Sequence, residues 1–190
     1  GNCAELRAGE EAVSDGKGFQ SCPKGKYATK AMALCEACPT GRYEPDPASA
    51  QCICAAAGHI PLLNIQTQLY ENQQECSEGY TAEGTCNAVC TQCTVGKYTS
   101  EAGETQCDCA VAGYTSSSPF TGQDICLKGT FSPVDCSSEC SPCAPGSFGP
   151  LNGMNTCIPC GRGHANNVPG FSGTECTAQT CDNYNADTAT

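Results

Sequence analysis

The stretch that decides the fold runs from residue 76 to 109 and carries the cysteines Cys76, Cys86, Cys90, Cys93, Cys107 and Cys109. The same six-cysteine pattern returns at Cys126, Cys136, Cys140, Cys143, Cys157 and Cys160. A five-cysteine version precedes both, at Cys22, Cys35, Cys38, Cys52 and Cys54. The first cysteines of successive patterns, which end with Cys176, stand 54, 50 and 50 residues apart. A fixed period near fifty residues predicts a tandem array in which each unit stacks on its neighbours.

The composition indicates that disulfides stabilise the chain. It has 20 cysteines in 190 residues, a density typical of disulfide scaffolds made in an oxidising compartment. Leu, Ile, Val and Phe together make up 23 residues, and there is no Trp. A core so thin offsets little conformational entropy, whereas each bridge over a loop of about 15 residues contributes roughly 3 kcal/mol. We therefore expect an extracellular or cell-surface protein whose twenty cysteines are all bridged.

The spacing divides the chain into five parts. Residues 1–21, with Cys3, are expected to be the end of a preceding unit. Residues 22–75, 76–125 and 126–175 are predicted to be modules 1, 2 and 3. Residues 176–190, with Cys176 and Cys181, are predicted to be a partial module and a polar tail. Because the chain starts at Gly1 without Met, we expect a mature or excised segment whose signal peptide is gone.

A glycine stands three residues after several of the cysteines and two residues before an aromatic residue. A glycine there allows a turn with positive φ, and the aromatic residue is expected to start a short extended segment. No helical periodicity of useful length is present. The sequence therefore predicts a small disulfide-rich fold: tandem modules of short β-hairpins and turns, stacked into an elongated rod. The glycines are Gly25, Gly41, Gly96, Gly129 and Gly146.

The charge is uneven along the chain. The net charge of −11 argues against nucleic acid or anionic lipid as a partner. Residues 17–43 carry a net charge of +4, while residues 61–190 hold 13 acids against three bases, a net charge of −10. This is either an ordinary solvated surface or a pair of complementary ends. No apolar run reaches the ~18 residues of a membrane span.

The pattern resembles the cysteine-rich modules of tumour-necrosis-factor receptors and ephrin receptors. Those modules share the Cys-x-x-Gly-x-Tyr opening seen at Cys22 and the Cys-x-x-Cys joint seen at Cys90. It is also similar to the repetitive surface antigens of ciliates and other protists. The resemblance covers residues 22–181 and implies a fold but hardly a function, since many extracellular proteins share such spacing.

The receptor resemblance implies a disulfide pairing in which the first cysteine of a module pairs with the second, the third with the fifth and the fourth with the sixth. The implied pairs in modules 2 and 3 are Cys76–Cys86, Cys90–Cys107, Cys93–Cys109, Cys126–Cys136, Cys140–Cys157 and Cys143–Cys160. Elsewhere they are Cys35–Cys52, Cys38–Cys54, Cys3–Cys22 and Cys176–Cys181. Connectivity does not follow from sequence alone.

Metal and catalytic sites have little support in the sequence. The spacing from Cys140 to Cys160 is near that of a zinc ribbon, but zinc would leave two cysteines of the module unused. His59 and His164 occupy one repeated slot after a glycine, which Tyr114 fills in module 2, so a structural role is favoured. The polar tail around Asn183 lacks the glycine and glutamate of a calcium loop. We expect no cofactor, no metal and no enzymatic activity.

Two further features concern contacts and modification. The linker after Cys54 is longer than the others and holds the chain's strongest apolar run, at Ile60, Leu62, Leu63 and Ile65. Exposed apolar insertions mark contacts, so these four residues are predicted to form an interface. Residues 115–119 are a candidate site for O-glycans.

The sequence favours a non-enzymatic extracellular structural protein of a cell-surface coat or filament. Its expected partners are copies of itself, or neighbouring modules of a larger chain. The alternative is a ligand-binding ectodomain of a receptor-type cysteine-rich protein. Opposed charge and a single apolar loop favour assembly over ligand binding.

Overall fold

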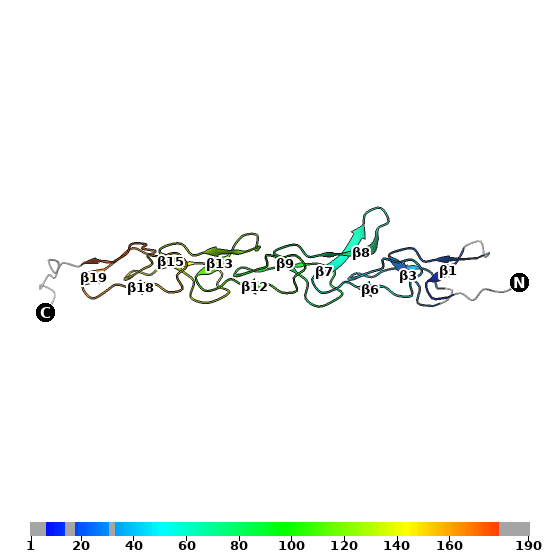
Figure 1. Cartoon of the computed structure of the whole chain (residues 1–190), viewed down its shortest axis with the longest axis horizontal. Helices are drawn as coiled ribbons and strands as arrows, with labels where there is room; N and C mark the ends of the chain where they lie inside the picture. The colour runs from blue at the N-terminus through cyan, green and yellow to red at the C-terminus, as the bar shows by residue number, and fades with distance from the viewer. Residues whose placement is uncertain (1–6, 14–17, 31–32, 179–190) are drawn as a thin grey trace, which may run out of the picture. The chain divides into compact units, whose positions relative to one another are not determined.

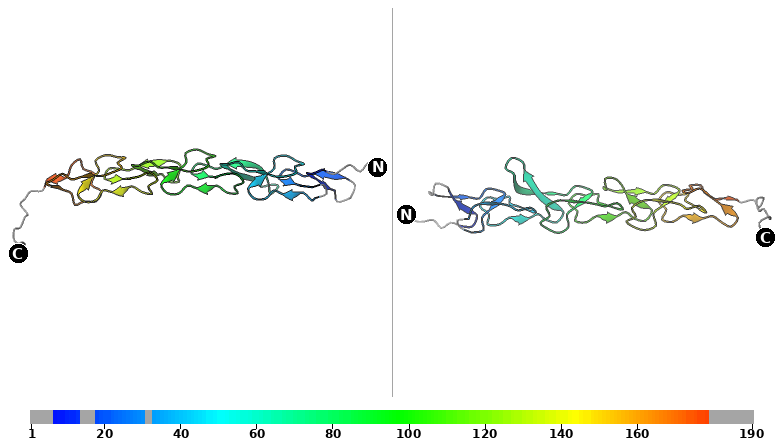
Figure 2. Two further views of the ribbon diagram at one scale, coloured as in Figure 1. Left: turned by 90° about the horizontal axis from the view of Figure 1, so that it is seen from below. Right: turned by 180° about the vertical axis from the view of Figure 1, so that it is seen from behind.

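The computed structural model describes residues 7–13, 18–30 and 33–178, and the regular structure in these ranges is ten two-stranded antiparallel hairpins (Figures 1 and 2). The chain forms two compact units, Gly1–Cys93 with Thr99–Cys107 and Thr94–Tyr98 with Asp108–Thr190. In the part of the chain that is described, no helix has the length and apolar character needed to cross a membrane. The small disulfide-rich β fold predicted from the sequence is confirmed, while the rod shape and the module boundaries stay predictions.

The first unit contains five hairpins. Their strands are β1 (Glu10–Ala12) with β2 (Phe19–Ser21), β3 (Lys26–Tyr27) with β4 (Glu36–Ala37), β5 (Arg42–Tyr43) with β6 (Ile53–Cys54), β7 (His59–Asn64) with β8 (Leu69–Glu75), and β9 (Tyr80–Thr81) with β10 (Thr91–Gln92). The expected extended segments at Tyr27 and Tyr43 are therefore present, each as the second residue of a two-residue strand.

The second unit contains the other five. Their strands are β11 (Lys97–Tyr98) with β12 (Asp108–Cys109), β13 (Tyr114–Ser116) with β14 (Gln123–Ile125), β15 (Thr130–Phe131) with β16 (Ser141–Pro142), β17 (Ser147–Phe148) with β18 (Ile158–Pro159), and β19 (His164–Ala165) with β20 (Thr177–Ala178).

One hydrogen-bond plan recurs in these hairpins. Gly58, with φ of 76°, precedes β7, and its N–H donates to the carbonyl of Ala82 in the next hairpin. The carbonyl of Gly58 accepts from the N–H of Cys76, the residue that closes the β7–β8 hairpin. The bond to the next hairpin recurs in the first unit as Gly9 to Ala28, Gly25 to Glu44 and Gly79 to Thr99, and in the second as Gly113 to Ser132, Gly129 to Gly149 and Gly146 to Asn166.

The period of about fifty residues therefore contains three hairpins. Gly79, Gly96, Gly113 and Gly129, each with positive φ, are spaced by 17, 17 and 16 residues. Backbone hydrogen bonds connect successive hairpins within each unit, so the stacking does not depend on a large apolar core. The most completely buried side chains are cysteines and alanines rather than long apolar residues.

Nine disulfides join cysteines of the described residues, and seven of them close a single hairpin. These are Cys22–Cys35, Cys38–Cys52, Cys76–Cys90, Cys93–Cys107, Cys126–Cys140, Cys143–Cys157 and Cys160–Cys176. The other two are Cys54–Cys86 and Cys109–Cys136. Each of them passes over one hairpin, because it joins the second strand of a hairpin to the loop of the second hairpin after it. Each unit is thus cross-linked both within hairpins and between them.

The pairing implied by the receptor resemblance is wrong at every bridge. Cys76 pairs with Cys90 instead of Cys86, and Cys126 pairs with Cys140 instead of Cys136. Corrected in the same way are the implied pairs Cys90–Cys107, Cys93–Cys109, Cys140–Cys157, Cys143–Cys160, Cys35–Cys52, Cys38–Cys54, Cys3–Cys22 and Cys176–Cys181. The physical reason is the geometry of the hairpin. In each bridged hairpin one cysteine lies before the first strand and the other lies at the end of the loop, directly before the second strand. Pairing of the two strands brings these cysteines together. Cys3 and Cys181 lie outside the described residues.

Two hairpins begin with alanine where seven others begin with cysteine. Ala55 and Ala110 are fully buried in the places that Cys76 and Cys126 take in neighbouring hairpins. Residues 55–76 and 110–126 are fully described, and neither hairpin has a disulfide across it. Their strands are longer than two residues, and β7 and β8 are the longest of the described strands. Strand pairing replaces the covalent bridge in these hairpins.

Candidate interaction surface on the β7–β8 hairpin

The predicted interface residues lie on β7 and at the turn that follows it. In Figure 1 and the right-hand view of Figure 2, this hairpin extends away from the other hairpins of the first unit. The side chains of Leu62, Leu63 and Ile65 are 42%, 39% and 82% exposed. Ile60, nearer the base of the hairpin, is only half-buried. Three of the four predicted residues are thus exposed to solvent.

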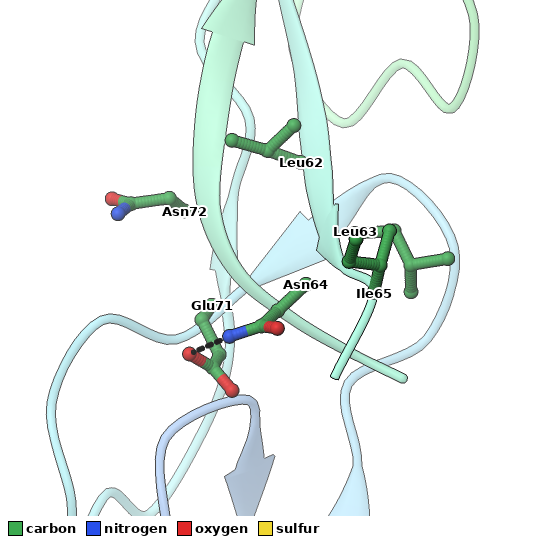
Figure 3. A pocket seen from close by; sticks show the side chains of 6 residues that line it. All are labelled: Leu62, Leu63, Asn64, Ile65, Glu71 and Asn72. Atoms are coloured by element: carbon green, nitrogen blue, oxygen red, sulfur yellow. Dashed lines mark hydrogen bonds between the residues drawn. The ribbon is translucent and has the colours of Figure 1, made fainter. Parts of the chain in front are cut away.

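A bulge in β8 sets the directions of these side chains. Leu62 is paired with Asn72 but Leu63 with Tyr70, so Glu71 is the extra residue on β8. Bulges bend a hairpin and re-aim its side chains. In Figure 3, Leu63 and Ile65 point to one side of the hairpin, and Asn64 points to the other side, toward Glu71. This alternation agrees with the two-residue period of a strand.

Polar bonds fix the tip of the hairpin. The side-chain amide of Asn64 donates to Glu71 at 2.9 Å, and the hydroxyl of Thr67 donates to the other carboxylate oxygen of Glu71. The side-chain oxygen of Asn64 also accepts from the backbone N–H of Gln66. The bonds from Thr67 and then Asn64 lower the pKa of Glu71, with a smaller contribution from Lys24. The Glu71 carboxylate is therefore occupied by hydrogen bonds within the turn, and the exposed side chains Leu62, Leu63 and Ile65 are apolar.

The base of the hairpin is attached to neighbouring hairpins of the same unit. The N–H of Glu44 donates to the carbonyl of Tyr70 at 3.0 Å, and the N–H of Ala56 donates to the side chain of Gln73 at 2.8 Å. Leu69 packs so closely on Gly25 that a Cβ at Gly25 would overlap it. The apolar tip is therefore held out on an anchored base. A shallow hollow of about 280 Å³ lies along it, lined by Leu62, Leu63, Asn64, Ile65, Glu71 and Asn72 (Figure 3).

The two histidines take equivalent places. His59 and His164 are the first residues of β7 and β19, and Tyr114 is the first residue of β13. Nδ1 of His59 lies 3.0 Å from the carbonyl of Ala57, and Nδ1 of His164 lies 3.2 Å from that of Arg162. Each ring thus binds the backbone two residues earlier, which supports a structural role. Nε2 of His59 also lies 3.8 Å from Glu75, its partner across the hairpin.

The remaining candidate sites are the metal sites considered from the sequence. Among the described residues no group of three or more His, Cys, Asp or Glu side chains could hold a metal ion. The four cysteines near zinc-ribbon spacing, from Cys140 to Cys160, are engaged in disulfides. Asn183, Asn185 and Asp187 lie outside the described residues.

The candidate O-glycan segment is partly used by the fold. The hydroxyl of Thr115 donates to the carbonyls of Ser137 and Ser138, and Ser116 Oγ accepts from the N–H of Gly96. Ser118 is exposed. If this segment carries a glycan, Ser118 is the residue we expect to bear it.

Comparison with known proteins agrees with the disulfide-rich architecture. No protein-family model matches the chain. It is similar to the mouse protein named signal peptide, CUB and EGF-like domain-containing protein 2, with 29% identity over 98 residues. The match covers 50% of this chain but 9% of that protein, so the activity of the whole protein is not carried over. With nine bridged pairs among its described residues, the chain is a disulfide-rich, tandem-repeat domain of the extracellular type.

Proposed function

We propose that this chain is a non-enzymatic structural module of the cell exterior that self-associates through the β7–β8 hairpin. The observation that carries the proposal is the outward presentation of Leu62, Leu63 and Ile65 on an anchored hairpin. In a chain with so little apolar mass, three exposed apolar side chains on one hairpin favour a contact surface over chance. A scaffold of bridged hairpins is also typical of proteins that bind or build rather than catalyse.

Replacing Leu62 and Leu63 by Ser tests the proposal. Sedimentation velocity over a concentration series should show association of the unmodified chain, and loss of association in L62S/L63S at the same concentrations. Because the bridges and backbone hydrogen bonds hold the hairpins, the variant should keep the native circular dichroism spectrum.

The matched control is L34S/V89S. Leu34 and Val89 are 77% and 70% exposed and lie on other hairpins of the first unit, so their replacement should leave association unchanged. If L62S/L63S associates as well as the unmodified chain, the proposed role of the hairpin is wrong.

A receptor-type ectodomain is the second candidate. The same exposed hairpin favours it, because a single projecting loop on a rigid scaffold is a common way to meet a ligand. A chain that stays monomeric at high concentration, yet loses affinity for a ligand when Leu62 and Leu63 are replaced, would favour this alternative.

A further inference from the structure

The second unit contains a hollow that is complementary in character to the β7–β8 tip. It measures about 330 Å³ and lies between the β15–β16 and β17–β18 hairpins. No charged side chain lines it. Because Pro142, Ala144 and Pro159 are exposed at its rim, an apolar group can enter from solvent. We call it the Phe131 pocket, and its walls include Phe131, Pro142, Ala144, Ser147, Cys157 and Pro159.

Comparison with the equivalent place in the first unit explains why the pocket is open. Arg42 is the first residue of β5 and follows the turn glycine Gly41. Ser147 is the first residue of β17 and follows the turn glycine Gly146, so the two residues are equivalent. The Arg42 guanidinium donates to the carbonyl of Cys52 at 2.9 Å, so its side chain lies across its own hairpin. Cys157 stands where Cys52 stands, since each closes a bridge 14 residues long. The short Ser147 side chain cannot reach across its hairpin as Arg42 does.

Charge also matches the two surfaces. The β3–β4 and β5–β6 hairpins, against which β8 packs, carry Lys24, Lys26, Lys30 and Arg42 against Glu36, Glu44 and Asp46, a net charge of +1. The described residues of the second unit carry five acids, Asp108, Asp124, Asp135, Glu139 and Glu175, against three bases. The hairpins beside the tip thus carry a small positive excess, the described residues of the second unit carry a net charge of −2, and both contact centres are apolar. This arrangement steers association and avoids like-charge repulsion.

We propose that the Phe131 pocket of one copy receives Leu63 and Ile65 from the β7–β8 hairpin of a second copy. The inference rests on the proposed self-association and names its second surface. Because the hairpin and the pocket are different surfaces of one chain, the contact is heterologous. Each copy then offers one free hairpin and one free pocket, and a contact of this kind that does not close gives an open chain of copies. Two side chains bury little area, so each single contact is weak.

A charge-complementation experiment tests direct contact. L63K and P159E each place a charge at one side of the contact, and each should weaken association in sedimentation velocity by at least about tenfold. The double variant L63K/P159E pairs the two charges and should recover association to within about threefold of the unmodified chain. Both positions are exposed, so the hairpins should fold normally.

A second variant tests the pocket without adding charge at its rim. S147R places in β17 the residue that β5 already accommodates at Arg42, so it should fold and cover the pocket. Association should fall by at least about tenfold. The matched controls are L34K and P39E, at exposed positions in the first unit, and they should associate like the unmodified chain.

The outcomes separate this inference from the function on which it rests. If the unmodified chain associates but L63K/P159E is no better than the weaker single variant, or S147R has no effect, the Phe131 pocket is not the partner surface. If the unmodified chain stays monomeric at every concentration, self-association itself is wrong and the inference is overturned with it.

Discussion

At the scale of single residues, the fold depends on glycines that bring two backbones together. Gly58 has φ of 76°, and a Cβ there would overlap the carbonyl of Gly103 from another hairpin of the same unit. The corresponding contact joins Gly41 to Cys86, and, in the second unit, Gly96 to Cys136. The glycine therefore has two tasks at once, a left-handed turn and a close approach between hairpins.

Gly58→Ala should lower the free energy of unfolding by about 2–4 kcal/mol, because it adds steric overlap to an unfavourable φ. The matched control is Gly84→Ala. Gly84 has a similar φ of 72° but nothing within 4 Å of its Cβ position, so the cost there should be about 1–2 kcal/mol. Guanidinium unfolding of the disulfide-intact protein, followed by circular dichroism, measures both. Equal losses would show that the close approach does not contribute.

The Glu71 carboxylate gives the β7–β8 tip a pH dependence. Hydrogen bonds from Thr67 and Asn64 hold its pKa below the ordinary value of 4.5. With the folded-state pKa lowered, the stabilisation is fully present above pH 4.5 and is lost as pH falls through the folded-state pKa.

Thr67→Ala should raise the pKa of Glu71 toward its ordinary value, and Thr67→Ser should keep it low because the hydroxyl remains. An NMR titration that follows the Glu71 side chain measures the shift. The same pKa in Thr67→Ala and the unmodified protein would mean that the Thr67 hydroxyl does not act on the carboxylate.

At the scale of elements, the hairpins use one of two means of closure. Seven have a bridge and two-residue strands, β7–β8 and β13–β14 begin with a buried alanine and have longer strands, and β1–β2 has three-residue strands with no cysteine between them. The two bridges between hairpins, Cys54–Cys86 and Cys109–Cys136, close loops of 32 and 27 residues, longer than the 13 to 16 of the others. Longer loops restrict the unfolded chain more, by about 0.5 kcal/mol in the chain-entropy model.

Peptide mapping without reduction should recover Cys54–Cys86 and Cys109–Cys136 as bridges between separate peptides. Free-thiol labelling of the denatured protein should give no signal, since we predict that all twenty cysteines are oxidised. Recovery of Cys76–Cys86 or Cys126–Cys136 would restore the receptor-type pairing and contradict bridges that close single hairpins.

The sequence predicted the kind of fold but not its connectivity. Cysteine spacing, Gly–aromatic pairs and the thin core were sufficient for bridged hairpins in tandem. They were not sufficient for pairing, because Cys86 and Cys90 are both within reach of Cys76 along the chain, and only the hairpin geometry selects Cys90. The shorter period of 16 or 17 residues was not predicted, although its signal is in the sequence: Lys26, Arg42 and Lys97 follow a turn glycine directly, as His59 does.

The candidate surface was predictable in part. The apolar run marked Leu62, Leu63 and Ile65, but the bulge at Glu71 and its bonds need the folded hairpin. The Phe131 pocket left a weak signal in the sequence. The residue after the turn glycine is basic at Lys26, Arg42 and Lys97, but Ser at position 147. Only the structure shows that such a basic side chain crosses its hairpin.

At the scale of the whole molecule, charge and apolar contact have separate effects on assembly. Residues 17–43 are net positive and residues 61–190 net negative. Exposed ion pairs contribute only ~0–1 kcal/mol each, so in the assembly that we propose charge would set direction and register and the apolar hairpin would supply most of the attraction. We therefore propose head-to-tail association, in which the positive region of one copy meets the C-terminal third of the next.

The most direct test of self-association is electron microscopy of the purified 190-residue chain at high concentration, in low salt and again above about 0.5 M salt, where screening acts within a few ångströms. We predict linear assemblies at low salt that become shorter, without disappearing, at high salt. Only isolated monomers at low salt, with a single monomeric species in sedimentation velocity at the same concentration, would contradict it.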